Sequence, residues 1–178
     1  QLVRAGSQWR ERCVAWDAAA GRGRPVAGDA VDPALVPAAL RDASDGALFE
    51  LPEAAAALVA RLGRRLALDG GAALILDYGF EGPALGDTLQ AIRAGAPADP
   101  FAAPGAADLT AHVDFAALAA VARAGGCAVH GPVPQGLFLD RLGLHARTAA
   151  LARANPAAAP ALRAAAVRLT DPAQMGAL

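Results

Sequence analysis

The sequence predicts an α/β fold, because a long amphipathic helix is followed at once by a short strand that is apolar throughout. Residues 53–68 carry leucines four positions apart, which is the spacing of a single helical face. Gly70 and Gly71 end this helix. Residues 72–77 then form an apolar run that is typical of a strand covered on both faces. Helix, glycine turn and buried strand together make half of an α/β crossover unit.

Composition narrows the class of protein. The chain has 178 residues, is rich in alanine and carries a net charge of −1. Its length suffices for one domain with a core, and the lack of a basic excess argues against non-specific nucleic-acid binding. The apolar runs are shorter than the roughly 20 residues that span a bilayer, so we expect no membrane insertion. Cys13 and Cys127 are far apart in the sequence, which favours a reduced, cytoplasmic setting.

The first part of the chain is predicted to start partway through a longer sequence and to continue as a hairpin. Gln1 opens the chain without a methionine, so we expect a fragment, and residues 1–20 lack the apolar core of a signal peptide. Residues 8–16 are predicted to form a strand, and residues 24–28 the return strand. Residues 29–46 contain two prolines and glycine, and are predicted to be a loop with at most a short helical turn.

Residues 80–111 break the regular pattern. They contain four prolines and several glycines, so only residues 87–94 are predicted to form a short helix. A long irregular stretch of this kind inside a domain is usually functional or disordered. Asp114 then resembles the N-cap of a helix that runs to about Arg123, where two glycines stop it.

The last part of the chain is predicted to be one strand followed by helices. Residues 127–133 are predicted as a short strand. The three helices are predicted at residues 135–142, 144–154 and 157–169, separated by a glycine and by an Asn-Pro pair.

The end of the predicted strand at residues 72–77 is the first candidate site. Asp77 and Tyr78, followed by Gly79, place polar groups directly after the apolar run. In open α/β sheets, ligands bind in the crevice outside the carboxyl ends of the strands. The alternative interpretation is structural, with both side chains hydrogen-bonded at the end of the strand. The residues alone leave both interpretations open.

Two polar clusters are further candidates. The first contains Asp87, Thr88 and Gln90, and the second spans residues 108–115. The candidates in the second cluster are Asp108, Thr110, His112 and Asp114. Aspartate and threonine also cap helices and form turns, so a purely local role is the competing interpretation.

Several common sites find no support in the sequence. The run Gly21-Arg22-Gly23 matches neither a dinucleotide-binding fingerprint nor a phosphate-binding loop. The three histidines never pair at helical spacing, so we predict no metal site. Ser7 and Ser44 are the only serines, and neither lies in a nucleophile elbow, which argues against hydrolase chemistry.

Several segments occur together in one order. They are "QLVRAGSQWRERCV", "LFELPEAAAALVARL", "LILDYG", "GDTLQA", "ADPFAAPGAADLTAHVDFAALA", "GPVPQGLFLDRLGLHAR" and "RLTDPAQMG". Over nearly its whole length the chain resembles the C-terminal half of MidA-like class I S-adenosylmethionine-dependent methyltransferases. Mitochondrial members of that family methylate an arginine on a subunit of respiratory complex I and are needed for its assembly. The segment "RAGAPAD" departs from the more basic and aromatic segment of relatives.

The resemblance implies a Rossmann-like methyltransferase sheet in which residues 72–77 are the fifth strand. It implies that the cofactor is S-adenosylmethionine, whose glycine motif lies N-terminal to Gln1, so no cofactor-binding residue is identified in this chain. Residues 1–85 would be the second half of the α/β core, and residues 86–150 a family-specific, mostly helical insertion. Residues 151–178 would lead to a last strand beyond the chain.

The resemblance also implies a protein substrate, a complex I subunit being the candidate, and a cytoplasmic location in bacteria or a mitochondrial one in eukaryotic relatives. An arginine substrate would need carboxylates that orient its guanidinium group. The carboxylates considered are Asp77, Asp87, Asp108 and Asp114, and Gln135 is a further crevice candidate. A non-catalytic binding or assembly module of the same fold is the alternative function. An α/β enzyme of another class, such as an oxidoreductase, is a third possibility that no residue supports.

Overall fold

The computed structural model describes residues 1–177 and confirms a mixed α/β fold. The described residues form five α-helices and three small sheets. They divide into two compact units. Unit 1 comprises residues 1–74 and 80–128, and unit 2 comprises residues 75–79 and 129–177.

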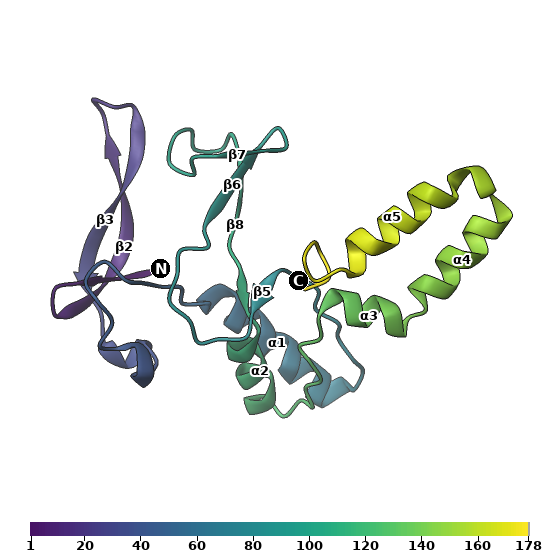
Figure 1. The fold of residues 1–178 in the computed structure, drawn as a ribbon. Helices are drawn as coiled ribbons and strands as arrows, with labels where there is room; N and C mark the ends of the chain where they lie inside the picture. Colours follow the sequence, from purple (N-terminus) through teal and green to yellow (C-terminus); the bar gives the residue numbers. More distant parts are fainter. Residues whose placement is uncertain (178) are drawn as a thin grey trace. The chain divides into compact units, whose positions relative to one another are not determined.

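The N-terminal part of unit 1 is an antiparallel sheet of four strands in the order β3-β2-β1-β4. The strands are β1 (Leu2–Ala5), β2 (Gln8–Asp17), β3 (Arg22–Ala30) and β4 (Leu48–Phe49). β2 and β3 form the long hairpin drawn in purple in Figure 1. The strand predicted at residues 8–16 and its return strand at residues 24–28 are both confirmed.

A small core lies against this sheet. Leu2, Trp9, Val36 and Phe49 are buried together, and Trp9 is the largest of them. The indole Nε1–H of Trp9 donates to the carbonyl oxygen of Arg41 at 3.0 Å, so the one polar atom of this side chain is satisfied. Val36 lies between the short 3-10 turns η1 (Pro33–Leu35) and η2 (Ala38–Leu40). The loop predicted at residues 29–46 with at most a short helical turn is thus confirmed from residue 31 onward, with two short turns in place of one.

Two helices pack together in unit 1. They are α1 (Glu53–Asp69) and α2 (Phe115–Ala124), which confirm the predicted helices. The helices approach closely at Gly63, where an added Cβ would lie 3.5 Å from Sγ of Cys127. The Cys127 thiol donates to the Gly63 carbonyl oxygen at 3.4 Å. Asp114 caps α2 as predicted, because its side chain accepts a hydrogen bond from the backbone N–H of Ala117.

A third group of strands lies between these two helices in the sequence. It contains β6 (Gln90–Arg93), β7 (Ala96–Ala98) and β8 (Asp108–Thr110), paired antiparallel in the order β7-β6-β8. The helix predicted at residues 87–94 is therefore wrong. The reason is the two-residue turn Ala94-Gly95, in which both residues have positive φ, as a tight hairpin requires. The segment predicted as an insertion at residues 86–150 thus contains these short strands as well as helices. The short strands β5 (Gly79–Phe80) and β9 (Val113–Asp114) form a further pair.

The strand predicted at residues 72–77 is also wrong. This segment joins no ladder among residues 1–177, and its apolar side chains are exposed by 69% at Leu74, 46% at Ile75 and 71% at Leu76. A strand forms only where neighbouring strands accept and donate its backbone hydrogen bonds, and the described residues provide no such neighbour here. The strand predicted at residues 127–133 is absent for the same reason.

The C-terminal part of unit 2 is helical, as predicted. It contains α3 (Gln135–Arg141), α4 (Leu144–Ala154) and α5 (Ala159–Thr170), with the 3-10 turn η3 (Pro156–Ala158) before α5. α4 and α5 run side by side as a helical hairpin, green to yellow in Figure 1. The side-chain amide of Gln135 donates to the carbonyl oxygens of Leu169 and Met175 at 3.0 and 3.2 Å. Gln135 thus fastens α3 to the end of α5.

Replacing Trp9 by alanine tests the position of the core. Trp9 is 1% exposed, so we expect the Trp9→Ala variant to lose about 3–5 kcal/mol of its free energy of unfolding. The matched control is Trp16→Ala, because Trp16 is 61% exposed and its removal should change stability by about 0.5 kcal/mol or less. Urea unfolding followed by far-ultraviolet circular dichroism measures both. Equal losses in the two variants would contradict a core centred on Trp9.

Candidate functional site

Unit 1 contains a cavity of about 500 Å³. It lies between β2, the N-terminal end of α1 and the segment around β9. Its apolar wall includes Val14, Leu51, Phe80, Leu89 and Phe101. Its polar lining includes Gln1, Arg12, Glu50, Glu53, His112 and Asp114. A cavity that combines an apolar wall with a few polar groups is the usual form of a small-ligand or side-chain binding site.

Arg12 is the cation of this cavity, and it is already neutralised. Its Nη1 atom lies 2.8 Å from Oδ2 of Asp87, which forms an ion pair. The same nitrogen donates to Oε1 of Gln1 at 2.7 Å, and Gln1 Nε2 donates to Oδ1 of Asp87 at 3.0 Å. The Arg12 guanidinium also lies 6.0 Å from the centre of the Phe101 ring.

The pKa of Asp87 reflects these contacts. Partial burial acts against the carboxylate and raises its pKa. Hydrogen bonds from Gln1 and Arg12, the positive charge of Arg12 and the backbone N–H of Leu89 together outweigh that cost. The pKa of Asp87 is therefore lowered from its ordinary value of 3.8, and the side chain is ionised at neutral pH.

A second set of hydrogen bonds joins Glu50 to His112. Glu50 accepts from Gln1 Nε2 at 2.6 Å, from the backbone N–H of Thr88 at 3.1 Å and from the Thr88 hydroxyl. The Thr88 hydroxyl oxygen in turn accepts from the backbone N–H of His112 at 2.8 Å. The Gln90 amide lies 3.2 Å from Nε2 of His112. Residues separated by up to 49 positions are thereby held at one side of the cavity.

Asp114 is the most deeply buried carboxylate of the cavity, with 7% exposure. Its Oδ1 atom accepts hydrogen bonds from the backbone N–H groups of Ala117 at 3.0 Å and Gly82 at 3.3 Å. Within residues 1–177, Oδ2 accepts no hydrogen bond. Residue 82 must be glycine here, because an added Cβ would come within 2.5 Å of Oδ2. One carboxylate oxygen thus fixes the backbone, and the other has no hydrogen-bond partner among the described residues.

The structure brings some of the predicted site residues together. His112 and Asp114 line the cavity, and Asp87, Thr88 and Gln90 hydrogen-bond to residues that line it. Asp108 and Thr110 are exposed on β8 and do not line it.

The remaining predicted residues belong to unit 2. Asp77 and Tyr78 are exposed and precede β5, which begins at Gly79, and Oδ1 of Asp77 accepts from the backbone N–H of Tyr78 at 2.9 Å. Gln135 has the structural contacts given above. The roles proposed for these residues stay predictions.

Sequence reasoning missed Gln1, Arg12, Glu50 and Glu53. Arg12 and Glu50 carried a weak signal, because each is a charged residue next to the apolar positions of a strand. Among residues 1–177, no group of three potential ligand side chains could hold a metal ion. No helix in the same range is long and apolar enough to cross a membrane.

The family is decided by a match over most of the chain. Residues 1–133 match the family model described as "Putative S-adenosyl-L-methionine-dependent methyltransferase". The chain belongs to this methyltransferase family. The matched segment contains all of unit 1 and therefore every residue that lines the cavity.

Curated relatives carry a more specific name. The chain is 46% identical to the mitochondrial protein arginine methyltransferase NDUFAF7 homolog of Drosophila melanogaster over 121 residues, which is 66% of this chain and 27% of that protein. It is 38% identical to the NDUFAF7 protein arginine methyltransferase of Danio rerio over 126 residues, which is 68% of this chain and 29% of that protein. The matches thus span less than a third of the relatives' length.

Solved structures share the fold of nearly the whole chain. An uncharacterized protein from Burkholderia thailandensis matches with a TM-score of 0.80 at 25% identity, covering 99% of this chain and 49% of that one. A structure of a member of the same superfamily from that organism, bound to S-adenosyl-homocysteine, matches with a TM-score of 0.77 at 24% identity. That second match covers 99% of this chain and 47% of the other. The chain therefore corresponds to about half of these two proteins.

Removing the charge of Asp87 tests its lowered pKa. A carboxylate whose pKa is lower in the folded state stabilises the fold above its unfolded pKa, and this contribution disappears as the pH falls through the folded pKa. We therefore expect Asp87→Asn to be less stable than the unchanged chain at pH 7 and to approach it below about pH 4. The difference at pH 7 should be about 1 kcal/mol or less, because the carboxylate is 38% exposed and screened by solvent.

The control for this experiment is Asp42→Asn. Asp42 is exposed and forms no ion pair within the described residues, so its removal should leave the pH dependence of stability unchanged. Chemical unfolding at a series of pH values gives both curves. Parallel curves for Asp87→Asn and the unchanged chain would contradict a lowered pKa.

Proposed function

We propose that the complete protein is an S-adenosylmethionine-dependent protein arginine methyltransferase, and that the cavity of unit 1 receives the guanidinium group of the target arginine. The observation that carries this proposal is the set of carboxylates in the cavity, Glu50, Glu53 and Asp114. They line a site inside the segment that the methyltransferase family model matches. The names of the curated relatives support arginine as the acceptor.

Carboxylates suit a guanidinium for a geometric reason. The planar, five-donor guanidinium pairs with carboxylate oxygens through two parallel hydrogen bonds, and this fixes its orientation as well as its position. Arg12 does not compete with an incoming guanidinium for the carboxylates that line the cavity, because it is already paired with Asp87. Oδ2 of Asp114 and the exposed carboxylate of Glu53 are the free acceptors in the described cavity.

Methyl transfer to nitrogen depends chiefly on positioning. The reacting nitrogen must approach the methyl group in line, and a bound, oriented guanidinium achieves this without bringing reactants together from solution. The transfer would form a nitrogen–carbon bond while the bond between the methyl carbon and the sulfonium sulfur of the donor breaks, and it would release one proton from the guanidinium. A carboxylate beside the nitrogen can accept that proton. In this proposal Glu53 or Asp114 orients the substrate and receives its proton.

We propose that the cofactor site lies mainly outside the described residues. No glycine-rich turn follows a parallel strand within residues 1–177, and such a turn is how Rossmann-like sheets hold a nucleotide. We therefore propose that S-adenosylmethionine, which supplies the methyl group when bound, is held by a part of the complete protein outside this range. The match to only 49% and 47% of the two solved chains supports this. The proposed partner is a protein, with a subunit of respiratory complex I as the candidate.

The Glu53→Gln variant of the complete protein tests the guanidinium site. Glutamine keeps the shape of the side chain and removes the charge that attracts the guanidinium. We expect kcat/KM for an arginine-containing substrate to fall about tenfold, mainly through KM, because one charge-assisted hydrogen bond is lost. The matched control is Glu11→Gln, an exposed carboxylate of β2 outside the cavity. Equal activity of both variants would contradict the site.

Binding of S-adenosylmethionine separates an enzyme from a non-catalytic assembly module. Isothermal titration of the complete protein should show saturable binding of S-adenosylmethionine. The chain of residues 1–178 alone should show none, because its described part lacks the glycine-rich turn. No binding to the complete protein would favour the assembly module, and binding to the short chain would contradict the proposed division of the site.

A further inference from the structure

The α4–α5 hairpin of unit 2 has an unusual charge. Residues 144–170 contain four arginines and one histidine, and they contain no aspartate or glutamate. The chain as a whole carries a net charge of −1, so the remaining residues are acidic on balance. The arginines are Arg147, Arg153, Arg163 and Arg168. Helices of this kind usually mix both signs on their exposed faces, so the absence of acids leaves positive charge uncompensated.

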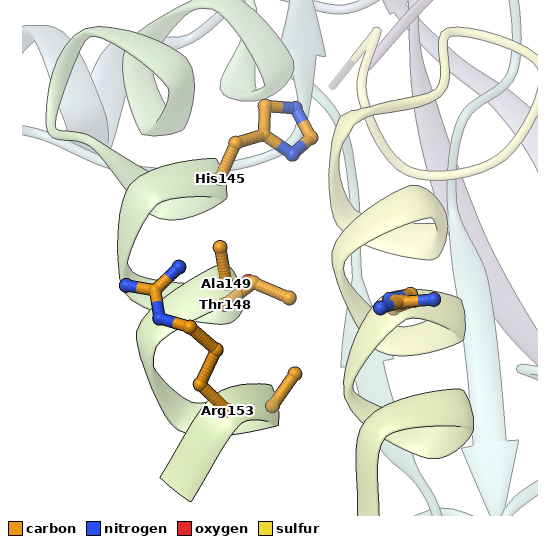
Figure 2. Close-up of a pocket in the computed structure, with 6 residues that line it drawn as sticks. His145, Thr148, Ala149 and Arg153 are labelled. Carbon is orange, nitrogen blue, oxygen red and sulfur yellow. The ribbon is translucent and has the colours of Figure 1, made fainter. Parts of the chain in front are cut away.

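Part of this charge surrounds a cavity of about 340 Å³ between the two helices. Its lining consists of His145, Thr148, Ala149, Ala152, Arg153 and Arg163. Figure 2 shows His145 and Thr148 on the side of α4 toward the facing helix, whereas the guanidinium group of Arg153 lies along the other side of α4. The two alanines have short side chains, and they leave the space between the cationic groups open.

The two arginines of the cavity have no acidic partner. Within residues 1–177 neither Arg153 nor Arg163 forms an ion pair, and both are exposed to solvent. His145 differs, because its Nε2 atom lies 2.9 Å from Oδ1 of Asp140. Asp140 belongs to α3 and does not line the cavity. Two arginines from two helices therefore line the cavity, and its lining contains no carboxylate.

Thr148 narrows the kind of ligand further. Its hydroxyl donates to the carbonyl oxygen of Leu144 at 2.8 Å, so this hydrogen is not available to a ligand. Among the lining residues, the main side-chain donors that remain are the N–H groups of the two arginines. Such forked donors match the paired oxygens of phosphate and carboxylate groups.

We propose that the cavity between α4 and α5 binds a small oxyanion with at least two negative charges, either a phosphate-bearing molecule or a dicarboxylate. Two uncompensated guanidinium groups favour two negative charges, and a volume of about 340 Å³ admits a ligand of that size. The site does not depend on the proposed methyl transfer, because most of unit 2, α4 and α5 included, lies after the segment that the family model matches. It is a second binding site of opposite charge preference.

The experiment titrates the full chain with pyrophosphate and, separately, with glutarate, and follows binding by calorimetry or by amide chemical shifts. We expect saturation at concentrations on the order of millimolar for at least one probe. Saturation by pyrophosphate alone assigns a phosphate-bearing ligand, and saturation by glutarate alone assigns a dicarboxylate. Saturation by neither probe overturns the proposal.

Charge-matched variants locate the site. Arg163→Gln and Arg153→Gln should each weaken binding about tenfold, because each removes a charge-assisted contact. Arg147→Gln is the control, since Arg147 is an equally exposed arginine of α4 outside the cavity, and at about 0.15 M salt its loss should matter little. Equal weakening by Arg147→Gln would show diffuse attraction by the hairpin and overturn the proposal.

A steric variant distinguishes the effect of the cavity's shape on binding from the effect of the hairpin's charge. Ala149→Leu keeps every charge of the hairpin and places a larger side chain in the cavity, at an exposed helical position that tolerates leucine. We expect binding of the probe to be lost, with helix content unchanged by circular dichroism. Unchanged affinity in this variant would mean that the ligand does not enter the cavity.

Discussion

The ion pair between Arg12 and Asp87 connects the parts of unit 1. The side chain of Arg12 is only 14% exposed, and a carboxylate partner offsets part of the cost of removing this cation from water. The partner, Asp87, lies 75 residues further along the chain. The pairing therefore brings the segment before β6 against β2, and Gln1 completes the contact by bonding to both side chains. The walls of the cavity are a consequence of this contact, because residues from both segments line it.

The carboxylates of this cavity have two roles: some of their oxygens hold the fold in place, and others are acceptors for the proposed ligand. Glu50 accepts three hydrogen bonds, from Gln1 and twice from Thr88, so it holds the wall in place. Asp114 uses one oxygen for the N-cap of α2 and the Gly82 backbone, and leaves the other oxygen unused by residues 1–177. Such preorganisation is favourable for binding, since the carboxylate does not have to be ordered when the ligand arrives.

The sequence predicted those elements whose signal is local. α1, α2 and the three C-terminal helices show periodic leucines, capping residues or bounding glycines, all of which act within a few residues. The strand predicted at residues 72–77 failed, because an apolar run specifies a strand only together with partners, and Leu74 and Leu76 have none within residues 1–177. The hairpin around Ala94-Gly95 was missed because alanine fits either face of a helix or a strand and hides the period.

The candidate site was also predictable in part, because some of its residues form a local pattern in the sequence. Asp87, Thr88, His112 and Asp114 lie in polar clusters that the sequence shows directly. The competing interpretation as caps and turns was also correct for Asp114, whose structural role and place in the cavity coexist. Arg12 and Glu50 could not be assigned, because their significance depends on contacts with residues 38 to 75 positions away. The local pattern around each residue gives only a weak signal, which does not reveal these distant contacts.

The linings of the two cavities favour ligands of opposite charge. The cavity of unit 1 offers carboxylates, and its one guanidinium is already paired with Asp87. The cavity of unit 2 offers unpaired guanidinium groups and has no carboxylate in its lining. A cation that suits the first is repelled by the second, and an oxyanion that suits the second meets Glu50, Glu53 and Asp114 in the first. Each cavity therefore excludes the other's ligand by charge alone, and an effect on one site can be measured without occupying the other.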